Sequence, residues 1–174
     1  MVLQSRRVAL AALFGAMIAV SKIVVPSPID KAVVIVQVVF LALSHLLLGS
    51  FGATSVALVD GVITAIWRTS NALFTLAFAL IYGLLVDVLS LALKVKTKEG
   101  DVETWKLTVA MTISTAFVGL ISYYVTVYLL ALLPRNPVLE AGIILAGVIN
   151  GVGGGYLASV IWRKTSLRLW GITT

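Results

Sequence analysis

The sequence has no cysteine and only one histidine, His45. The first absence excludes disulfides, thiolate nucleophiles and cysteine-ligated metals, and the second excludes a site built from several imidazoles. Charge is also scarce, because only 11% of the 174 residues are charged while 60% are hydrophobic. Soluble domains carry about 25% charged and about 45–50% apolar residues. The composition therefore excludes a soluble enzyme domain and a disordered chain, and it predicts an integral membrane protein.

Six long apolar segments follow one another along the chain. A membrane-spanning helix requires about 20 mostly apolar residues, and the segments cover roughly 8–25, 31–48, 52–67, 71–93, 107–133 and 138–162. They are continuously apolar rather than alternating, which favours helices over a membrane β-barrel. We expect an all-α membrane protein, a bundle of six transmembrane helices that forms one domain over residues 1–174. The third segment is the weakest span, because it is short and contains Asp60.

Turn residues separate these segments. Two prolines within 26–28 end the first one, because proline lacks an amide proton and restricts the residue before it. Residues 49–52, Gly-Ser-Phe-Gly, predict a very tight turn. Ser70 or Asn71 is expected to cap the helix that follows. The only hydrophilic loop spans 94–106.

The distribution of basic residues predicts the orientation. If both termini lie in the cytoplasm, the inside holds nine basic residues: Arg6, Arg7, Lys94, Lys96, Lys98, Lys106, Arg163, Lys164 and Arg168. The outside then holds only three: Lys31, Arg68 and Arg135. Such a bias follows the positive-inside rule. We therefore expect a multi-pass protein of the cell membrane with both termini cytoplasmic, and the net charge of +6 requires no nucleic-acid partner.

Small residues recur at four-residue steps, which allows helices to pack closely in lipid. The third segment carries such a stripe at 53, 57, 61 and 65, and the sixth carries Gly147, Gly151 and Gly155. These two stripes predict packing inside the bundle. The first segment has two overlapping stripes, one at Ala12 and Ala16 and one at 11, 15 and 19. One face of this segment is therefore a hypothetical docking site for another subunit.

Ionisable residues within the apolar segments are costly and usually face the bundle interior, a cavity or a partner. Asp60 is the deepest, and a ligand or proton contact and an ion pair between helices are equally open interpretations. Lys22 is expected to extend its amine toward the membrane surface. Asp87 is expected to pair with basic residues of the inner loop. His45 is interpreted as a packing residue.

The outer half of the predicted bundle collects aromatic rings, amides and charges. Tyr124 and Tyr128 lie one helical turn apart and share a face. Aromatic walls with a few polar groups suit a small, flat, polar ligand. The candidate substrate-binding residues are Gln37, Trp67, Asn71, Tyr124, Tyr128, Glu140 and Asn150. Taken one at a time, the aromatic residues are better explained as anchors at the membrane interface, and it is their collection on one side that favours a ligand site.

Motifs for catalysis or nucleotide binding are missing. The sequence has no Gly-x-Ser-x-Gly, no His-Glu-x-x-His and no Walker motif. The glycine-rich run at 151–155 has no preceding strand, so it does not predict a nucleotide-binding loop. We expect neither an enzyme nor a bound cofactor, and any ATP-driven process requires a separate ATPase.

Four short patterns make the chain resemble the substrate-binding S components of energy-coupling factor (ECF) transporters. They are 12–16 (ALFGA), 48–53 (LGSFGA) leading to Asp60-Gly61, 79–87 (ALIYGLLVD) and 149–156 (INGVGGGY). The resemblance covers nearly the whole chain in length and topology. It implies capture of a vitamin or similar micronutrient from outside and delivery through a transmembrane T component energised by two cytoplasmic ATPases. It also implies that Ala12 and Ala16 contact the T component.

Two other functions remain open from the residues alone. One is an accessory structural subunit of a membrane complex, without a ligand. The other is a small secondary transporter, with Asp60 or Lys22 as the coupling group. Retention of a small molecule during purification discriminates the first from an S component. Ion-dependent uptake without an ATPase is the mark of the second.

Overall fold

The structure is a computed structural model that describes residues 2–24, 34–96, 101–129 and 135–170. The described residues form six α-helices, a short 3₁₀ turn and a π-helical segment. In chain order these are α1 (Val2–Val24), α2 (Val34–Leu48), α3 (Gly52–Trp67), η2 (Thr69–Asn71), α4 (Ala72–Ala92), α5 (Thr104–Tyr124), η3 (Val125–Leu129) and α6 (Pro137–Trp170). Over these ranges no β-strand forms, and one isolated bridge joins Lys96 to Val102.

The predicted all-helical class is confirmed for the described part of the chain, and each predicted segment overlaps one helix. Four helices are long and apolar enough to cross a membrane, namely those within Ser5–Val24, Ala72–Ala92, Thr104–Leu129 and Pro137–Thr165. The apolar helices α2 and α3 are shorter, with 15 and 16 residues. α6 continues to Trp170, well past the predicted end at 162. Its 34 residues correspond to about 51 Å, against about 30 Å for the hydrocarbon core of a bilayer.

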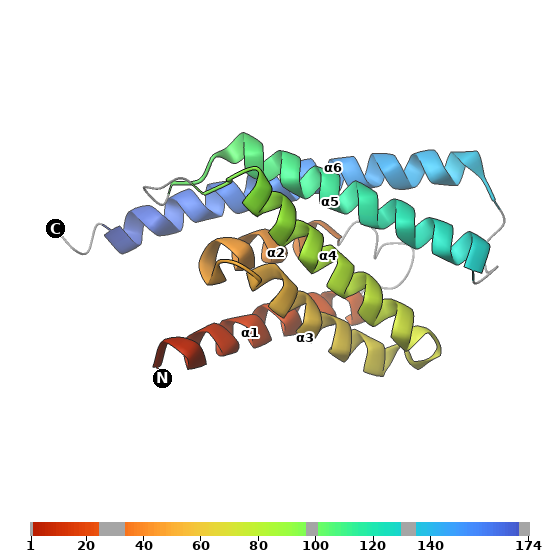
Figure 1. The fold of residues 1–174 in the computed structure, drawn as a ribbon, viewed down its shortest axis with the longest axis horizontal. Coiled ribbons are helices and arrows are strands. Elements are labelled where there is room, and N and C mark those ends of the chain that lie inside the picture. The colour runs from red at the N-terminus through yellow and green to blue at the C-terminus, as the bar shows by residue number, and fades with distance from the viewer. Residues whose placement is uncertain (1, 25–33, 97–100, 130–134, 171–174) are drawn as a thin grey trace.

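The helices run back and forth between two ends of the molecule (Figure 1). One end, which we call the terminal end, holds both termini and the connection from α4 to α5. The opposite end, which we call the turn end, holds the α3–α4 turn, the last residues of α5 and the first residues of α6. The start of α1 and the ends of α4 and α6 thus lie at the terminal end.

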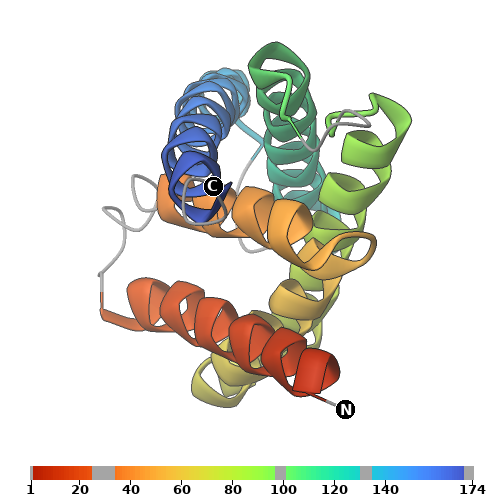
Figure 2. The ribbon, with the colours of Figure 1, turned by 90° about the vertical axis from the view of Figure 1, so that its left-hand side faces the viewer.

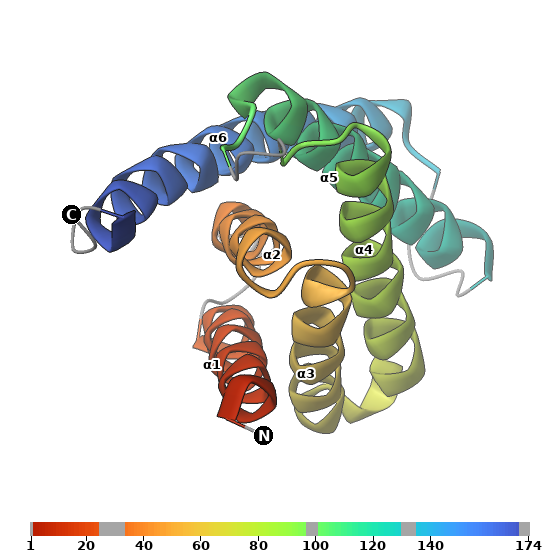
Figure 3. The same ribbon diagram turned by 60° about the vertical axis from the view of Figure 1, so that its left-hand side comes forward.

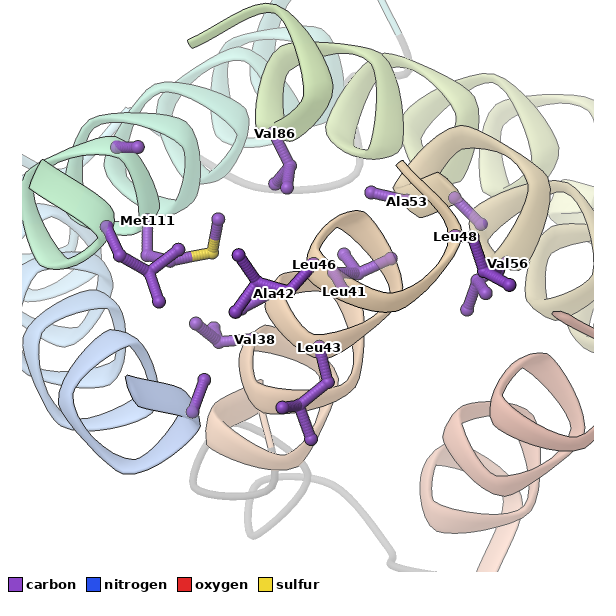
Figure 4. Close-up of a cluster of buried hydrophobic side chains, with 14 of the residues drawn as sticks. Val38, Leu41, Ala42, Leu43, Leu46, Leu48, Ala53, Val56, Val86 and Met111 are labelled. Carbon is purple, nitrogen blue, oxygen red and sulfur yellow. The ribbon is translucent and has the colours of Figure 1, made fainter. Parts of the chain in front are cut away.

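α2 occupies the middle of the bundle, with α1 and α3 on one side and α5 and α6 on the other (Figures 2 and 3). α5 packs most extensively on α6, α3 on α4, and α1 on α3. α1 is therefore an edge helix. The hydrophobic core surrounds α2: Val38, Leu41 and Leu46 are essentially inaccessible and contact the neighbouring helices, with Met111 of α5 close by (Figure 4).

The glycine stripe of α6 lets its backbone approach that of α5. A Cβ added at Gly151 would lie 2.4 Å from the Cα of Thr112, and one at Gly147 would lie 2.8 Å from the Cα of Ala116. Real Cβ atoms do not approach backbone this closely, so only glycine fits at these positions. The predicted internal role of this stripe is confirmed for Gly147 and Gly151.

The tight turn predicted at 49–52 connects α2 to α3. Gly49 has a φ of +77° and Phe51 a φ of +65°, both in the left-handed region. The amide of Gly52 donates to the carbonyl of Gly49 over 2.9 Å. A bulky residue in this conformation is strained unless its surroundings fix it, and the contacts that fix this turn come from α4, as described below.

Candidate functional site

Three tyrosines form a row of rings near the turn end, which we call the tyrosine row: Tyr123, Tyr124 and Tyr128. The ring centroids of Tyr123 and Tyr124 are 5.6 Å apart with a tilt of 59°. Those of Tyr124 and Tyr128 are 5.9 Å apart and nearly parallel, at 21°. The row becomes more exposed outward, from 3% for Tyr123 to 38% for Tyr124 and 60% for Tyr128. Tyr128, the outermost ring, is thus the one most open to a ligand among the described residues.

The start of α6 holds this row in place. The Tyr123 hydroxyl donates to the Asn136 carbonyl over 3.2 Å and accepts from the Asn136 amide over 3.1 Å. Asn136 also caps α6, because its side-chain oxygen accepts from the amide of Val138 over 2.9 Å. The Tyr124 hydroxyl donates to a carboxylate oxygen of Glu140. Glu140 lies in the first turn of α6, where a helix N-terminus favours negative charge.

The segment η3 shapes the row. Five residues, Val125–Leu129, continue α5 as a π-helix. π-helical turns are rare and are found frequently at functional sites. Here the segment carries Tyr128 and places its ring parallel to that of Tyr124. The sequence predicts that these two tyrosines share a face, and the structure brings them together.

The other predicted substrate-binding residues do not join this group. Trp67 is 69% exposed at the end of α3, and Asn71 is exposed in the α3–α4 turn, where its side chain makes no capping bond to α4. Gln37 is 8% exposed in the first turn of α2. Asn150 is half-buried in α6 and donates to the carbonyl of Ala146 over 2.8 Å. The expected cap by Asn71 is therefore wrong. The α3–α4 turn, which carries Trp67 and Asn71, lies at the turn end, as does the end of α5 (Figure 1).

Lys22 and Asp60 form an ion pair between α1 and α3. The Lys22 amine lies 2.6 Å from a carboxylate oxygen of Asp60, which is fully buried. The hydroxyl of Thr64 donates to the other oxygen over 3.2 Å. Lys22 therefore pairs within the bundle instead of extending only toward the membrane surface, and its side chain keeps 26% exposure.

A second buried carboxylate, Asp87 of α4, joins three helices. One oxygen lies 2.7 Å from His45 Nδ1 of α2 and accepts from the amide of Ala53 over 3.2 Å. The other accepts from the amide and hydroxyl of Thr54 over 2.8 and 2.7 Å. Asp87 thus caps the N-terminus of α3, since no side chain within the helix does so. The expected partners of Asp87, basic residues of the inner loop, are wrong, because α3 presents free amide donors nearer to the carboxylate.

The two small-residue stripes of α1 differ in their surroundings. Ala11 and Ala19 are buried, and a Cβ at Gly15 would lie 2.6 Å from Val59 Cβ of α3. This stripe is therefore used within the bundle. Ala12 is exposed and Ala16 is half-buried, so the stripe that the resemblance assigns to partner binding is the less covered of the two.

Sequence reasoning missed several residues that complete these sites. Tyr123 is separated from Tyr124 by 100° on a helix, so periodicity gave no reason to group them. Thr54 and Thr64 are ordinary helix residues in the sequence, and only their distances to Asp87 and Asp60 assign them roles. A signal was available for Asn136, because asparagine directly before a proline is typical of a helix start.

In the described part of the chain, no three His, Cys, Asp or Glu side chains gather where a metal would be held. The polar side chains described above either join helices to one another or, as in the tyrosine row with Glu140, lie near the surface.

No family model matches the chain, and no curated protein and no solved structure matches it.

Proposed function

We propose that this protein is the substrate-binding membrane subunit of an ECF-type importer. In this proposal all six helices span the cell membrane, both termini are cytoplasmic and the turn end faces outside. A vitamin-like molecule binds at the outer half, and a T component with two ATPases delivers it inward. The chain itself carries out no chemistry.

The observation that carries the proposal is the free stripe on α1. α1 lies at the edge of the bundle (Figure 2), and its Ala11, Gly15 and Ala19 face is covered by α3. Ala12 remains exposed with Ala16 beside it. Small residues let another helix approach closely in lipid, so this stripe can receive a helix of the T component without any rearrangement of the bundle.

The docking experiment replaces a small residue with a large one. Ala12→Trp and Ala16→Trp are expected to reduce co-purification with the co-expressed T component and ATPases at least about tenfold, because a bulky side chain keeps the docked helix away. Met17→Trp is the matched control, since Met17 is 46% exposed on another side of α1. Normal yield of the complex with both alanine variants would overturn the assignment.

The ligand experiment tests the binding function directly. Native mass spectrometry of the purified protein is expected to detect a retained small molecule. Trp67→Ala and Asn150→Ala are each expected to weaken its binding at least about tenfold, because a lost hydrogen bond or stacking contact to a bound ligand costs on the order of 1–3 kcal/mol. Calorimetric titration of the detergent-solubilised variants measures this. Unchanged affinity in both would place the ligand elsewhere.

One observation favours a second candidate, a small secondary transporter. A fully buried carboxylate paired with an amine inside an apolar bundle, as Asp60 and Lys22 are, is an arrangement used in ion-coupled transport. This candidate requires uptake into vesicles that contain only this chain, driven by a proton or sodium gradient. Uptake that depends strictly on the T component and ATP would exclude it.

A further inference from the structure

We infer that the tyrosine row together with Glu140 recognises the positively charged part of a small organic molecule. This inference rests on the proposed function, because it states the charge of the small molecule that the importer subunit is proposed to capture. The site lies at the turn end, where the last turns of α5 meet the first turn of α6 (Figure 1).

Glu140 supplies a negative charge that has no ion-pair partner among the described residues. Its bonded partner in the described structure is the neutral hydroxyl of Tyr124, and no ion pair joins it to a described basic residue. Arg135, the described basic residue nearest in sequence, is exposed and forms no ion pair with this carboxylate, although it lies close enough to act electrostatically on the Tyr124 hydroxyl. By contrast, Asp60 and Asp87, the buried acids of the bundle, already have partners. A bound cation would therefore be the first direct ion-pair partner of Glu140 among the described contacts.

The aromatic rings add a second feature that selects a cation. Cations bind the face of an aromatic ring within about 6 Å of its centroid. Tyr128 offers such a face, because it is 60% exposed and only one side of its ring is covered by Tyr124. No hydrogen bond fixes the Tyr128 hydroxyl to another described residue, so its ring is free to adjust to a ligand.

The spacing of the row also admits a flat ring. A planar ligand between two rings requires a centroid separation of about 7 Å, twice the optimal carbon–carbon distance. Tyr124 and Tyr128 are 5.9 Å apart, so a shift of about 1 Å by Tyr128 opens the gap. Tyr124 cannot move as easily, because its hydroxyl is bonded to Glu140 and its other side contacts Tyr123. The fixed ring and carboxylate thus position the ligand, and the free ring closes over it.

Anchoring at the membrane interface explains these tyrosines less completely. An interfacial anchor directs its hydroxyl to lipid headgroups and water. Here the hydroxyls of Tyr123 and Tyr124 are used by Asn136 and Glu140 of the neighbouring helix. The rings consequently stand in a fixed order beside a carboxylate, which is the composition of a cation site rather than of an anchor.

The experiment compares choline with 3,3-dimethyl-1-butanol, which has the same shape without the charge. The full-length protein, labelled with ¹³C in its tyrosine rings, is titrated in a neutral detergent at constant ionic strength. Resonances are assigned from single Tyr→Phe variants. Choline is expected to shift the Tyr124 and Tyr128 resonances in a saturable manner, on the order of millimolar. The neutral alcohol is expected to produce no saturable shift.

Three variants make the result specific. Glu140→Gln keeps an acceptor for Tyr124 but removes the charge, and it should weaken choline binding at least about tenfold. Tyr128→Leu should weaken it about three- to tenfold. Tyr156→Leu is the matched control, because Tyr156 is 57% exposed elsewhere on α6, and it should leave affinity unchanged. Circular dichroism verifies that each variant is folded.

The outcomes discriminate this inference from the proposed function. Equal shifts with choline and the alcohol, or choline binding that survives Glu140→Gln, would overturn the cation site. If the protein docks on the T component and retains a neutral or anionic molecule, the cation site fails while the importer stands. If choline binds as expected but no T component is engaged, the importer fails while the cation site stands.

Discussion

Replacing Asp87 with asparagine is the most informative test of how the bundle is held together. Asp87 is 1% exposed and receives four contacts, from His45 Nδ1, the Ala53 amide, and the amide and hydroxyl of Thr54. Asparagine keeps one acceptor oxygen and presents an NH₂ group in place of the other. In either orientation of this side chain the NH₂ group faces a backbone amide of α3, that of Thr54 or that of Ala53, which is itself a donor. The buried amide at the start of α3 thus loses its acceptor, and α3 loses the negative charge that stabilises its N-terminus.

The expected magnitude follows from these contacts. A hydrogen bond to a charged group contributes about 1.5–3 kcal/mol, and an unpaired buried donor costs about 1–3 kcal/mol. The loss of such a bond together with the unpaired amide leads us to expect that Asp87→Asn lowers the free energy of unfolding by about 3–5 kcal/mol. The helices α2, α3 and α4 should lose stability together, because the same carboxylate joins all three.

Reversible unfolding in mixed micelles, with dodecyl sulfate titrated into a mild detergent, measures this free energy by circular dichroism. Thr54→Val is the matched control, because it removes only the hydroxyl that donates to Asp87 and leaves the amide bond in place. It removes one hydrogen bond to a charged group and should cost about 1.5–3 kcal/mol, less than Asp87→Asn. The reasoning is refuted if Asp87→Asn lies within about 0.5 kcal/mol of the wild type, or if Thr54→Val costs as much as Asp87→Asn.

Three further predictions concern packing, pairing and topology. Gly151→Ile should separate α5 from α6 and destabilise the protein by at least about 3 kcal/mol, whereas Gly142→Ile, where no atom lies within 4 Å of the added Cβ, should stay within about 0.5 kcal/mol by the same unfolding assay. Lys22→Asp and Asp60→Lys should each lower the free energy of unfolding by about 3–5 kcal/mol. The double exchange should lose measurably less than the two single losses added together, and a loss equal to that sum would contradict a direct pair. A cysteine at Gly100, in a segment outside the described residues, should react with a membrane-impermeant reagent only after cell lysis, and labelling in intact cells would reverse the proposed orientation.

The helices could be predicted from the sequence because the signal is local. Continuous apolar runs and the residues that interrupt them are sufficient to locate each helix, and the Gly-Ser-Phe-Gly turn at 49–52 was recognisable from its composition alone. The helix ends were less accurate. α6 continues past 162 to Trp170 because a polar, basic sequence can extend a helix beyond an apolar one, and hydropathy does not record this.

The pairing of polar groups could not be predicted in the same way. Lys22 and Asp60 are 38 residues apart, and His45 and Asp87 are 42 apart, so their contacts depend on which helices are neighbours. The two stripes of α1 illustrate the same limit. Both were visible in the sequence, but only the packing of α3 against Gly15 decides which is covered. The sequence named Tyr124, Tyr128 and Glu140 as candidates. The contact between Tyr123 and Asn136, which holds the row in place, depended on the geometry of two helix ends and could not be predicted.

The close approach of α5 and α6 has a consequence for how the protein can move. Where backbones touch through Gly147 and Gly151, no side chain is available to yield, so the two helices must travel as one body. The seam between α4 and α5 is different, because there side chains meet, as in the 2.7 Å contact between the hydroxyls of Tyr82 and Thr115. Side chains can change rotamers and exchange partners while backbones in contact cannot. An opening that moves α5 and α6 together, and the tyrosine row with them, should therefore separate α4 from α5, and it must also release α6 from α2, which packs against it.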